Sequence, residues 1–146
     1  MKIKENFQWI VYAANIAGHY IPYIKSVASP VSSTVGLVTK GMESLGIIDK
    51  DNKYLNTARV AAAGALTIEF IINASSLANG SDIGSGAEAC ITAASDAAVI
   101  YSLYLDMKYS TGRSFIENTK RAYHTTHDLV QRAARWAREK IEKNKN

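Results

Sequence analysis

Hydrophobic residues recur at intervals of three and four along almost the whole chain, which is the period of an amphipathic helix. The pattern predicts helices over about residues 5–25, 30–45, 56–79, 85–109 and 114–143. At 146 residues the chain has the length of one domain. We therefore expect an all-α fold, a compact four- or five-helix bundle in a single domain over residues 1–146, with the last few residues frayed.

Two segments rich in small residues, 55–79 and 87–107, flank a glycine-containing loop over residues 80–86. Ala, Gly and Ser allow two helix backbones to approach closely, so the pair predicts a central αα-hairpin. We expect the first helix of this hairpin to be the buried centre of the bundle. Polar residues recur at helical spacing in the second helix, which predicts a solvent-facing stripe and a half-exposed helix. That stripe comprises Glu88, Thr92, Ser95, Asp96, Ser102 and Asp106.

Several residues are typical of helix ends. Ser29 before Pro30 predicts an N-terminus, and Gly46 predicts the end of the same helix. Asn52 or Asn56 is the expected cap of the third helix. Ser114 and Glu117 match the capping box, in which each side chain binds the other residue's backbone N–H.

The hairpin is apolar enough to raise the question of a membrane. The large apolar side chains of residues 55–79 contribute roughly −2 to −4 kcal/mol on an insertion scale, and one central charge such as Glu69 costs about 2.5 to 3.5 kcal/mol. Glu88 and Asp96 oppose insertion of the second helix in the same way. The sum favours a soluble bundle, with Glu69 and Asp96 as buried polar residues that need partners.

Positive charge is concentrated in the last helix. The net charge is +4, and residues 112–146 carry nine Lys or Arg against four Asp or Glu. We expect a solvated helix face with Trp136 docked into the bundle; a partner or membrane surface is the alternative. The residues of that surface are Arg132, Arg135, Trp136, Arg138, Lys140 and Lys143.

Candidate chemistry is sparse. His124, His127 and Asp128 have the spacing of metal ligands on one helix face, and Glu88, Asp96 or His19 could supply a third ligand. We expect ordinary surface residues instead, because they lie on the polar face of their helix and no Glu-x-x-His pair recurs on a second helix. We predict no cofactor and no catalytic residue. The single cysteine, Cys90, excludes an intrachain disulfide and is expected in the core.

These patterns favour a non-enzymatic interaction or assembly protein that binds protein partners or itself through helix faces, as a homo-oligomer. The alternative is a membrane-active helical protein that uses residues 55–107 and the basic C-terminal helix on an anionic membrane surface. A metal-dependent enzyme built on His124 and His127 is a third hypothesis. The sequence argues against nucleic-acid binding, and the expected location is cytoplasmic, with peripheral membrane association or signal-independent export as alternatives.

Overall fold

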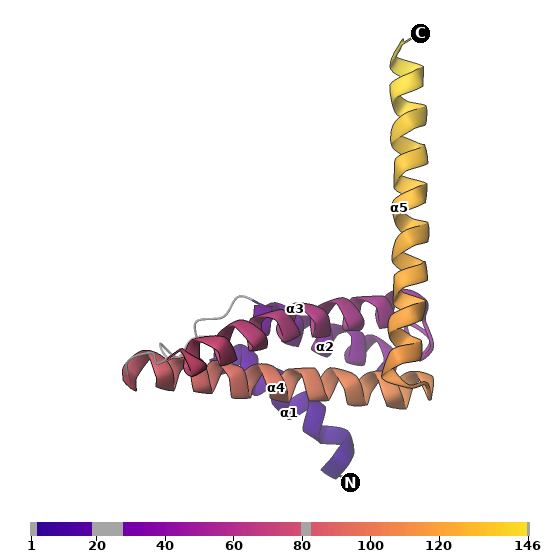
Figure 1. Ribbon diagram of the computed structural model, residues 1–146. Coiled ribbons are helices and arrows are strands. Elements are labelled where there is room, and N and C mark those ends of the chain that lie inside the picture. The colour runs from indigo at the N-terminus through magenta and orange to yellow at the C-terminus, as the bar shows by residue number, and fades with distance from the viewer. Residues whose placement is uncertain (1–2, 19–27, 80–82, 146) are drawn as a thin grey trace.

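The computed structural model describes residues 3–18, 28–79 and 83–145, and within these it is built of five helices (Figure 1). They are α1 (Ile3–Gly18), α2 (Ala28–Ser44), α3 (Lys53–Ala78), α4 (Ile83–Thr111) and α5 (Phe115–Lys145). The described residues form no strand, which confirms the all-α prediction.

Helices α1 to α4 pack as an antiparallel bundle, called the bundle below. Trp9 near the start of α1 lies beside Lys40 near the end of α2, and Asn15 farther along α1 bonds Ser29 at the start of α2. The contact between α3 and α4 is the most extensive in the molecule, and the two run side by side in Figure 1. As a result α2 ends, α3 begins and α4 ends at one end of the bundle.

That end carries most of the charge of the bundle and its connections, and we call it the charged end. Its residues include Lys50, Asp51, Lys53, Lys108 and Arg113. The side chain of Asp51 accepts hydrogen bonds from Arg113 at 2.7 Å and from Arg121 at 2.8 Å. These ion pairs connect the turn before α3 with the start of α5.

α5 is not part of the bundle. It runs crosswise to α3 and α4 from the charged end and extends far beyond them (Figure 1). Only Asn118, Ala122 and Thr125 of this helix are buried. The prediction of a compact bundle therefore holds for α1 to α4, whereas the fifth helix projects from it.

The predicted helix ends are largely confirmed. The Asn52 side chain accepts from the backbone N–H groups of Tyr54 and Leu55, and Gly46 adopts a φ of 69° just after α2. Ser114 and Glu117 exchange the two hydrogen bonds of the capping box, at 3.2 and 3.3 Å.

Two expectations about helix ends differ from the structure. The first helix ends at Gly18 in the part described, and the predicted continuation to residue 25 lies outside it. Ser29 lies inside the first turn of α2 and does not precede the helix. Its hydroxyl donates to the amide oxygen of Asn15, so the side chain joins α2 to α1.

The crossing of α1 and α2 depends on a glycine. The ring of Tyr12 occupies the space that a Cβ atom at Gly36 would fill. This close approach brings Tyr12 into contact with a small apolar core, in which it packs with Ala62, Ala63, Leu66, Val99 and Leu103.

Candidate functional site

The interior of the bundle is unusually polar. The largest fully buried side chains of α1 to α4 include Arg59, Gln8 and Asp96 beside the apolar ones. Proteins seldom bury such groups unless they are paired, because leaving water costs free energy. We call the buried polar residues of the bundle the polar interior and treat it as the candidate site.

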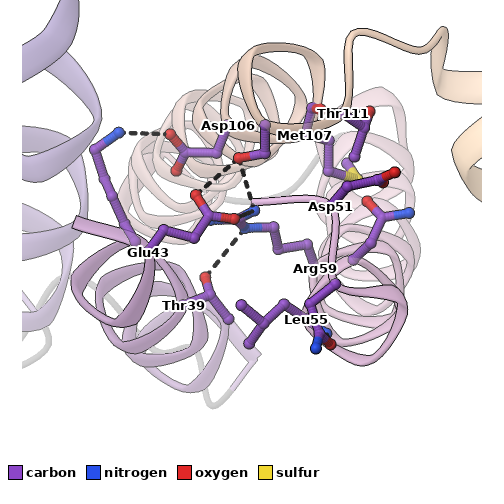
Figure 2. Close-up of polar contacts among 12 residues, drawn as sticks. Thr39, Glu43, Asp51, Leu55, Arg59, Asp106, Met107 and Thr111 are labelled. Carbon is purple, nitrogen blue, oxygen red and sulfur yellow. Dashed lines mark hydrogen bonds and ion pairs between the residues drawn. The ribbon is translucent and has the colours of Figure 1, made fainter. Parts of the chain in front are cut away.

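The first cluster of the polar interior surrounds Arg59 on α3, which is 1% exposed (Figure 2). Its guanidinium donates to Glu43 at 2.7 Å, to Thr39 at 3.1 Å and to Ser110 at 3.2 Å. The hydroxyl of Ser110 in turn donates to Glu43 at 2.8 Å. This network ties α2, α3 and α4 together near the charged end.

A second cluster lies beside it. Asp106 on α4 accepts a hydrogen bond from the hydroxyl of Tyr12 at 2.6 Å and pairs with Lys40 at 2.8 Å. Figure 2 shows Asp106 next to the Arg59 cluster. Both buried carboxylates near the charged end, those of Asp106 and Glu43, thus have cationic partners.

Asp96 is placed differently. It is fully buried on α4, and neither carboxylate oxygen has a hydrogen-bond partner among the described residues. The polar residues that face it from α3 are Glu69, which is half-buried, and Asn73. Nearby, Asn15 donates to the hydroxyl of Ser95. Asp96 therefore lies in the middle of the bundle with no cationic partner in the part of the chain that the structure describes.

The surface of the bundle is the opposite of its interior. Among the described side chains of residues 6–18, 28–44, 60–79 and 86–107, the most exposed ones are uncharged. The charged ones are partly or fully buried, namely Lys40, Glu43, Glu69, Glu88, Asp96 and Asp106. We call the exposed side chains of these four ranges the apolar band. Its largest members include Ile10, Val31, Ile68, Ile71, Ile72, Ile91 and Tyr101.

The apolar band overturns the predicted orientation of the hairpin. The most apolar 18-residue window of α3 has a mean hydropathy of 1.5, yet only 17% of it is buried. The stripe on α4 expected to face solvent points inward instead, since Thr92, Asp96, Ser102 and Asp106 are buried. With the polar faces of the helices turned inward, the large apolar residues occupy the outer faces.

Two residues that we expected to be buried, Cys90 and Trp136, are exposed. Cys90, expected in the core, is exposed, because it lies on the outer face of α4 among alanines. Trp136 is 63% exposed and does not dock into the bundle, because α5 leaves the bundle after Thr125.

The remaining sequence candidates lie on α5. Arg132, Arg135, Arg138, Lys140 and Lys143 are all exposed, and Lys140 lies over the ring of Trp136. His124, His127 and Asp128 are exposed as well, and Tyr123 stacks on His127. In the part of the chain that the structure describes, no three His, Cys, Asp or Glu residues are grouped as metal ligands.

A cleft of about 660 Å³ opens at the charged end. Aromatic and charged side chains line it, among them Trp9, Tyr109, Lys40 and Lys50. Gln8 also lines it and is 1% exposed, with no hydrogen-bond partner for its Oε1 atom in the structure described. The cleft therefore connects the polar interior with the charged surface.

No family model, curated protein or solved structure matches this chain.

Sequence reasoning did not single out Arg59, Gln8 or Asn15 as interior residues. One sequence feature could have drawn attention to Arg59: it is the last cation before 48 residues without Lys or Arg. For Gln8 and Asn15 no local pattern distinguishes a polar residue that faces inward from one that faces water.

Proposed function

We propose that this chain is a non-enzymatic membrane protein whose bundle is embedded in a lipid bilayer, with α3 and α4 crossing it. The observation that carries the proposal is the combination of a polar interior with an apolar band, in which the most exposed side chains of the described residues are uncharged. In water this distribution is unfavourable, because apolar surface is hydrated and polar groups are desolvated. In lipid the same distribution is favourable, because the apolar surface contacts acyl chains and the polar groups are kept away from them.

The dimensions support this proposal. Residues 60–78 of α3 are helical and contain a single charged residue, Glu69. At 1.5 Å per residue they extend about 28 Å, close to the roughly 30 Å hydrocarbon core of a bilayer. A soluble protein can also contain one long apolar helix, but such a helix is mostly buried, whereas α3 is not.

α4 must lie at the same depth as α3, because the two helices contact each other along their length. Its Asp96 is hidden from the surroundings by neighbouring helices. Charged residues within membrane helices characteristically face the bundle interior, which lowers the cost of insertion. The insertion free energy estimated from the sequence included the full cost of a lipid-exposed charge for Asp96 and Glu69. The sequence alone does not show that Asp96 faces the interior.

The charged end has the composition of a membrane–water interface. Trp9 and Tyr109 line the cleft there, and Tyr54 at the start of α3 is exposed. Trp and Tyr gather at this level because the ring prefers the acyl boundary and the polar atom prefers water. Lys50 and Lys53 mark the start of the aqueous side.

The test is to measure where single cysteines lie in liposomes that contain the full chain. In a Cys90→Ala background, Ile68→Cys probes the apolar band and Lys120→Cys probes α5. We expect resistance to carbonate extraction, slow reaction of Ile68→Cys with a charged maleimide and fast reaction of Lys120→Cys. Equal fast reaction at both positions, or release of the protein by carbonate, would refute the proposal.

Assembly with a second copy is the second candidate function. A groove of about 510 Å³ on the outer face of α3 and α4 is lined almost entirely by apolar atoms. Its residues include Phe70, Ala97, Tyr101 and Phe115. Large aromatic residues around a small one form the kind of surface that a neighbouring helix can fill.

The assembly candidate is tested by sedimentation of the chain in detergent. Ala97→Leu places a larger side chain in the groove and should weaken self-association. Ala134→Leu, on the exposed part of α5, is the matched control and should leave it unchanged. A wild-type chain that stays monomeric at every detergent ratio would contradict this candidate.

A further inference from the structure

More than half of α5 has no partner. Every side chain from residue 126 to residue 145 is exposed, although the helix is regular over its whole length. Its sequence places opposite charges four residues apart, Asp128 and Arg132 as well as Glu139 and Lys143, a spacing that favours helix formation. These 20 residues form an arm about 30 Å long that reaches beyond the bundle, and we call it the free arm.

The free arm is amphipathic, and its apolar face has a defined direction. Ala122 is buried against the bundle. Leu129, Ala133 and Trp136 follow it by seven, eleven and fourteen residues, which places them on the same side of the helix. The apolar face of the free arm therefore points to the side on which the bundle lies.

The opposite face is polar. Gln131 and Arg135 are displaced by about half a turn from Ala122, and Arg138 lies on the same side. Arg132 and Lys143 lie at the border between the faces. Lys140 follows Ala122 by 18 residues, so it lies on the apolar side, where it lies over the ring of Trp136. A lysine there can keep its stem in apolar surroundings and extend its charge to the headgroups. A helix with Trp136 on one side and arginines on the other suits the boundary between acyl chains and anionic headgroups.

The direction of α5 relative to α3 and α4 determines how it would lie on a membrane. α5 leaves the bundle at the charged end and runs crosswise to α3 and α4 (Figure 1). If α3 and α4 cross a bilayer, α5 lies in the plane of its surface. Its apolar face then points into the membrane that holds the bundle, and its polar face points into water.

We propose that the free arm is an interfacial helix that binds the anionic lipid surface on the side of the charged end. This inference rests on the proposed embedding of the bundle, and it adds the partner and the orientation. The chain has no Lys or Arg between Arg59 and Lys108, so the connection between α3 and α4 has none. Under the positive-inside rule the charged end then faces the cytoplasm, where the leaflet is rich in anionic lipid.

The connection between α1 and α2 contains one lysine, Lys25. A second copy or another soluble helix could also cover an apolar stripe. The membrane is favoured because a crosswise arm with its apolar face toward the bundle has lipid beneath it along its whole length.

The experiment compares two neighbouring positions on opposite faces of the free arm. In the Cys90→Ala background, Ala133→Cys and Gln131→Cys are each labelled with an environment-sensitive fluorophore, and Ile68→Cys reports on the bundle. The full chain is reconstituted into vesicles of phosphatidylcholine alone or mixed with phosphatidylglycerol. We expect blue-shifted emission and quenching by spin-labelled lipid at residue 133, water-like emission at residue 131, and a stronger contrast in the anionic vesicles.

Charge variants test the partner. Replacing Arg132, Arg135 and Arg138 with Gln should abolish the difference between the two vesicle types at residue 133. The matched control, Glu139→Gln with Glu142→Gln, should increase it. In both variants the signal at residue 68 should stay unchanged, because the bundle is held by its own apolar band.

The other possible outcomes refute either the interfacial helix, the embedding of the bundle or the lipid partner. A probe at residue 133 in water while residue 68 is in lipid refutes the interfacial helix and leaves the embedded bundle intact. Residues 68 and 133 both in water refute the embedding itself. Protection of residue 133 that depends on protein density and not on lipid charge shows that α5 pairs with a second copy, and it refutes the lipid partner.

Discussion

The hydroxyl of Tyr12 on α1 donates a 2.6 Å hydrogen bond to the carboxylate of Asp106 on α4, across 94 positions of sequence. Asp106 is only 3% exposed, and its second oxygen pairs with Lys40. One buried carboxylate thereby joins α1, α2 and α4. Hydrogen bonds of this kind, with an ionised acceptor away from water, are among the stronger ones in proteins.

Tyr12→Phe tests that bond directly. Removal of the hydroxyl leaves the Asp106 carboxylate with one fewer donor, so we expect a loss of about 1.5 to 3 kcal/mol in the free energy of unfolding. Thermal unfolding in detergent, followed by circular dichroism, measures it. Tyr101→Phe is the control, because Tyr101 is exposed and should tolerate the change. Equal stability of the two variants would show that the bond contributes nothing.

Gly36→Ala tests the close approach of α1 and α2. The added methyl group would overlap the ring of Tyr12, so the helices must separate, at a cost of about 1 to 3 kcal/mol. Gly64→Ala is the matched control, since no atom lies within 4 Å of its added Cβ. That variant should gain about 0.5 to 1 kcal/mol from helix propensity. A shift of the melting temperature in the same direction for both variants would show that the close approach at Gly36 is not required.

Arg59→Leu removes the centre of the network that joins α2, α3 and α4. The buried Glu43 carboxylate then lacks its cation, and we expect a loss of about 3 to 5 kcal/mol. Arg121→Leu breaks an ion pair of similar length with Asp51 on the exposed surface. Such a pair contributes about 0 to 1 kcal/mol. A small effect at Arg59 in the same melting assay would mean that water or lipid reaches Glu43.

Asp96→Leu should behave in the opposite way. Because neither oxygen of this buried carboxylate has a partner among the described residues, its removal relieves a desolvation cost. We expect unchanged or higher stability, measured as the melting temperature in detergent beside that of the Asp106→Leu control, which should be destabilised. A loss comparable to that of Asp106→Leu would reveal a partner for Asp96.

Sequence patterns predicted the helices and their ends because these depend on local chemistry. The capping residues Asn52, Ser114 and Glu117 act within three positions of themselves, so their role can be read without knowledge of the fold. The same holds for Gly46, which adopts a backbone conformation that other residues avoid.

Sequence patterns did not predict which face of each helix turns inward. Periodicity at Ile68, Ile71 and Ile72 defines an apolar face, but the direction of that face depends on whether water or lipid surrounds the bundle. Assuming water placed α3 in the buried centre and the polar stripe of α4 toward solvent, whereas most of the apolar part of α3 is exposed and that stripe is largely buried. Arg59 was missed for a related reason, since its partners lie on α2 and α4 and no local pattern connects them.

The shape of the molecule has a consequence for crowding. α5 is 31 residues long, which corresponds to about 46 Å of rigid helix, and it is attached at one end of the bundle. When the bundle turns about its long axis, this helix sweeps a disc far wider than the bundle itself. At high density, two neighbouring copies can therefore approach closely when their α5 helices lie side by side or point away from each other, so close packing would restrict the directions in which these helices point.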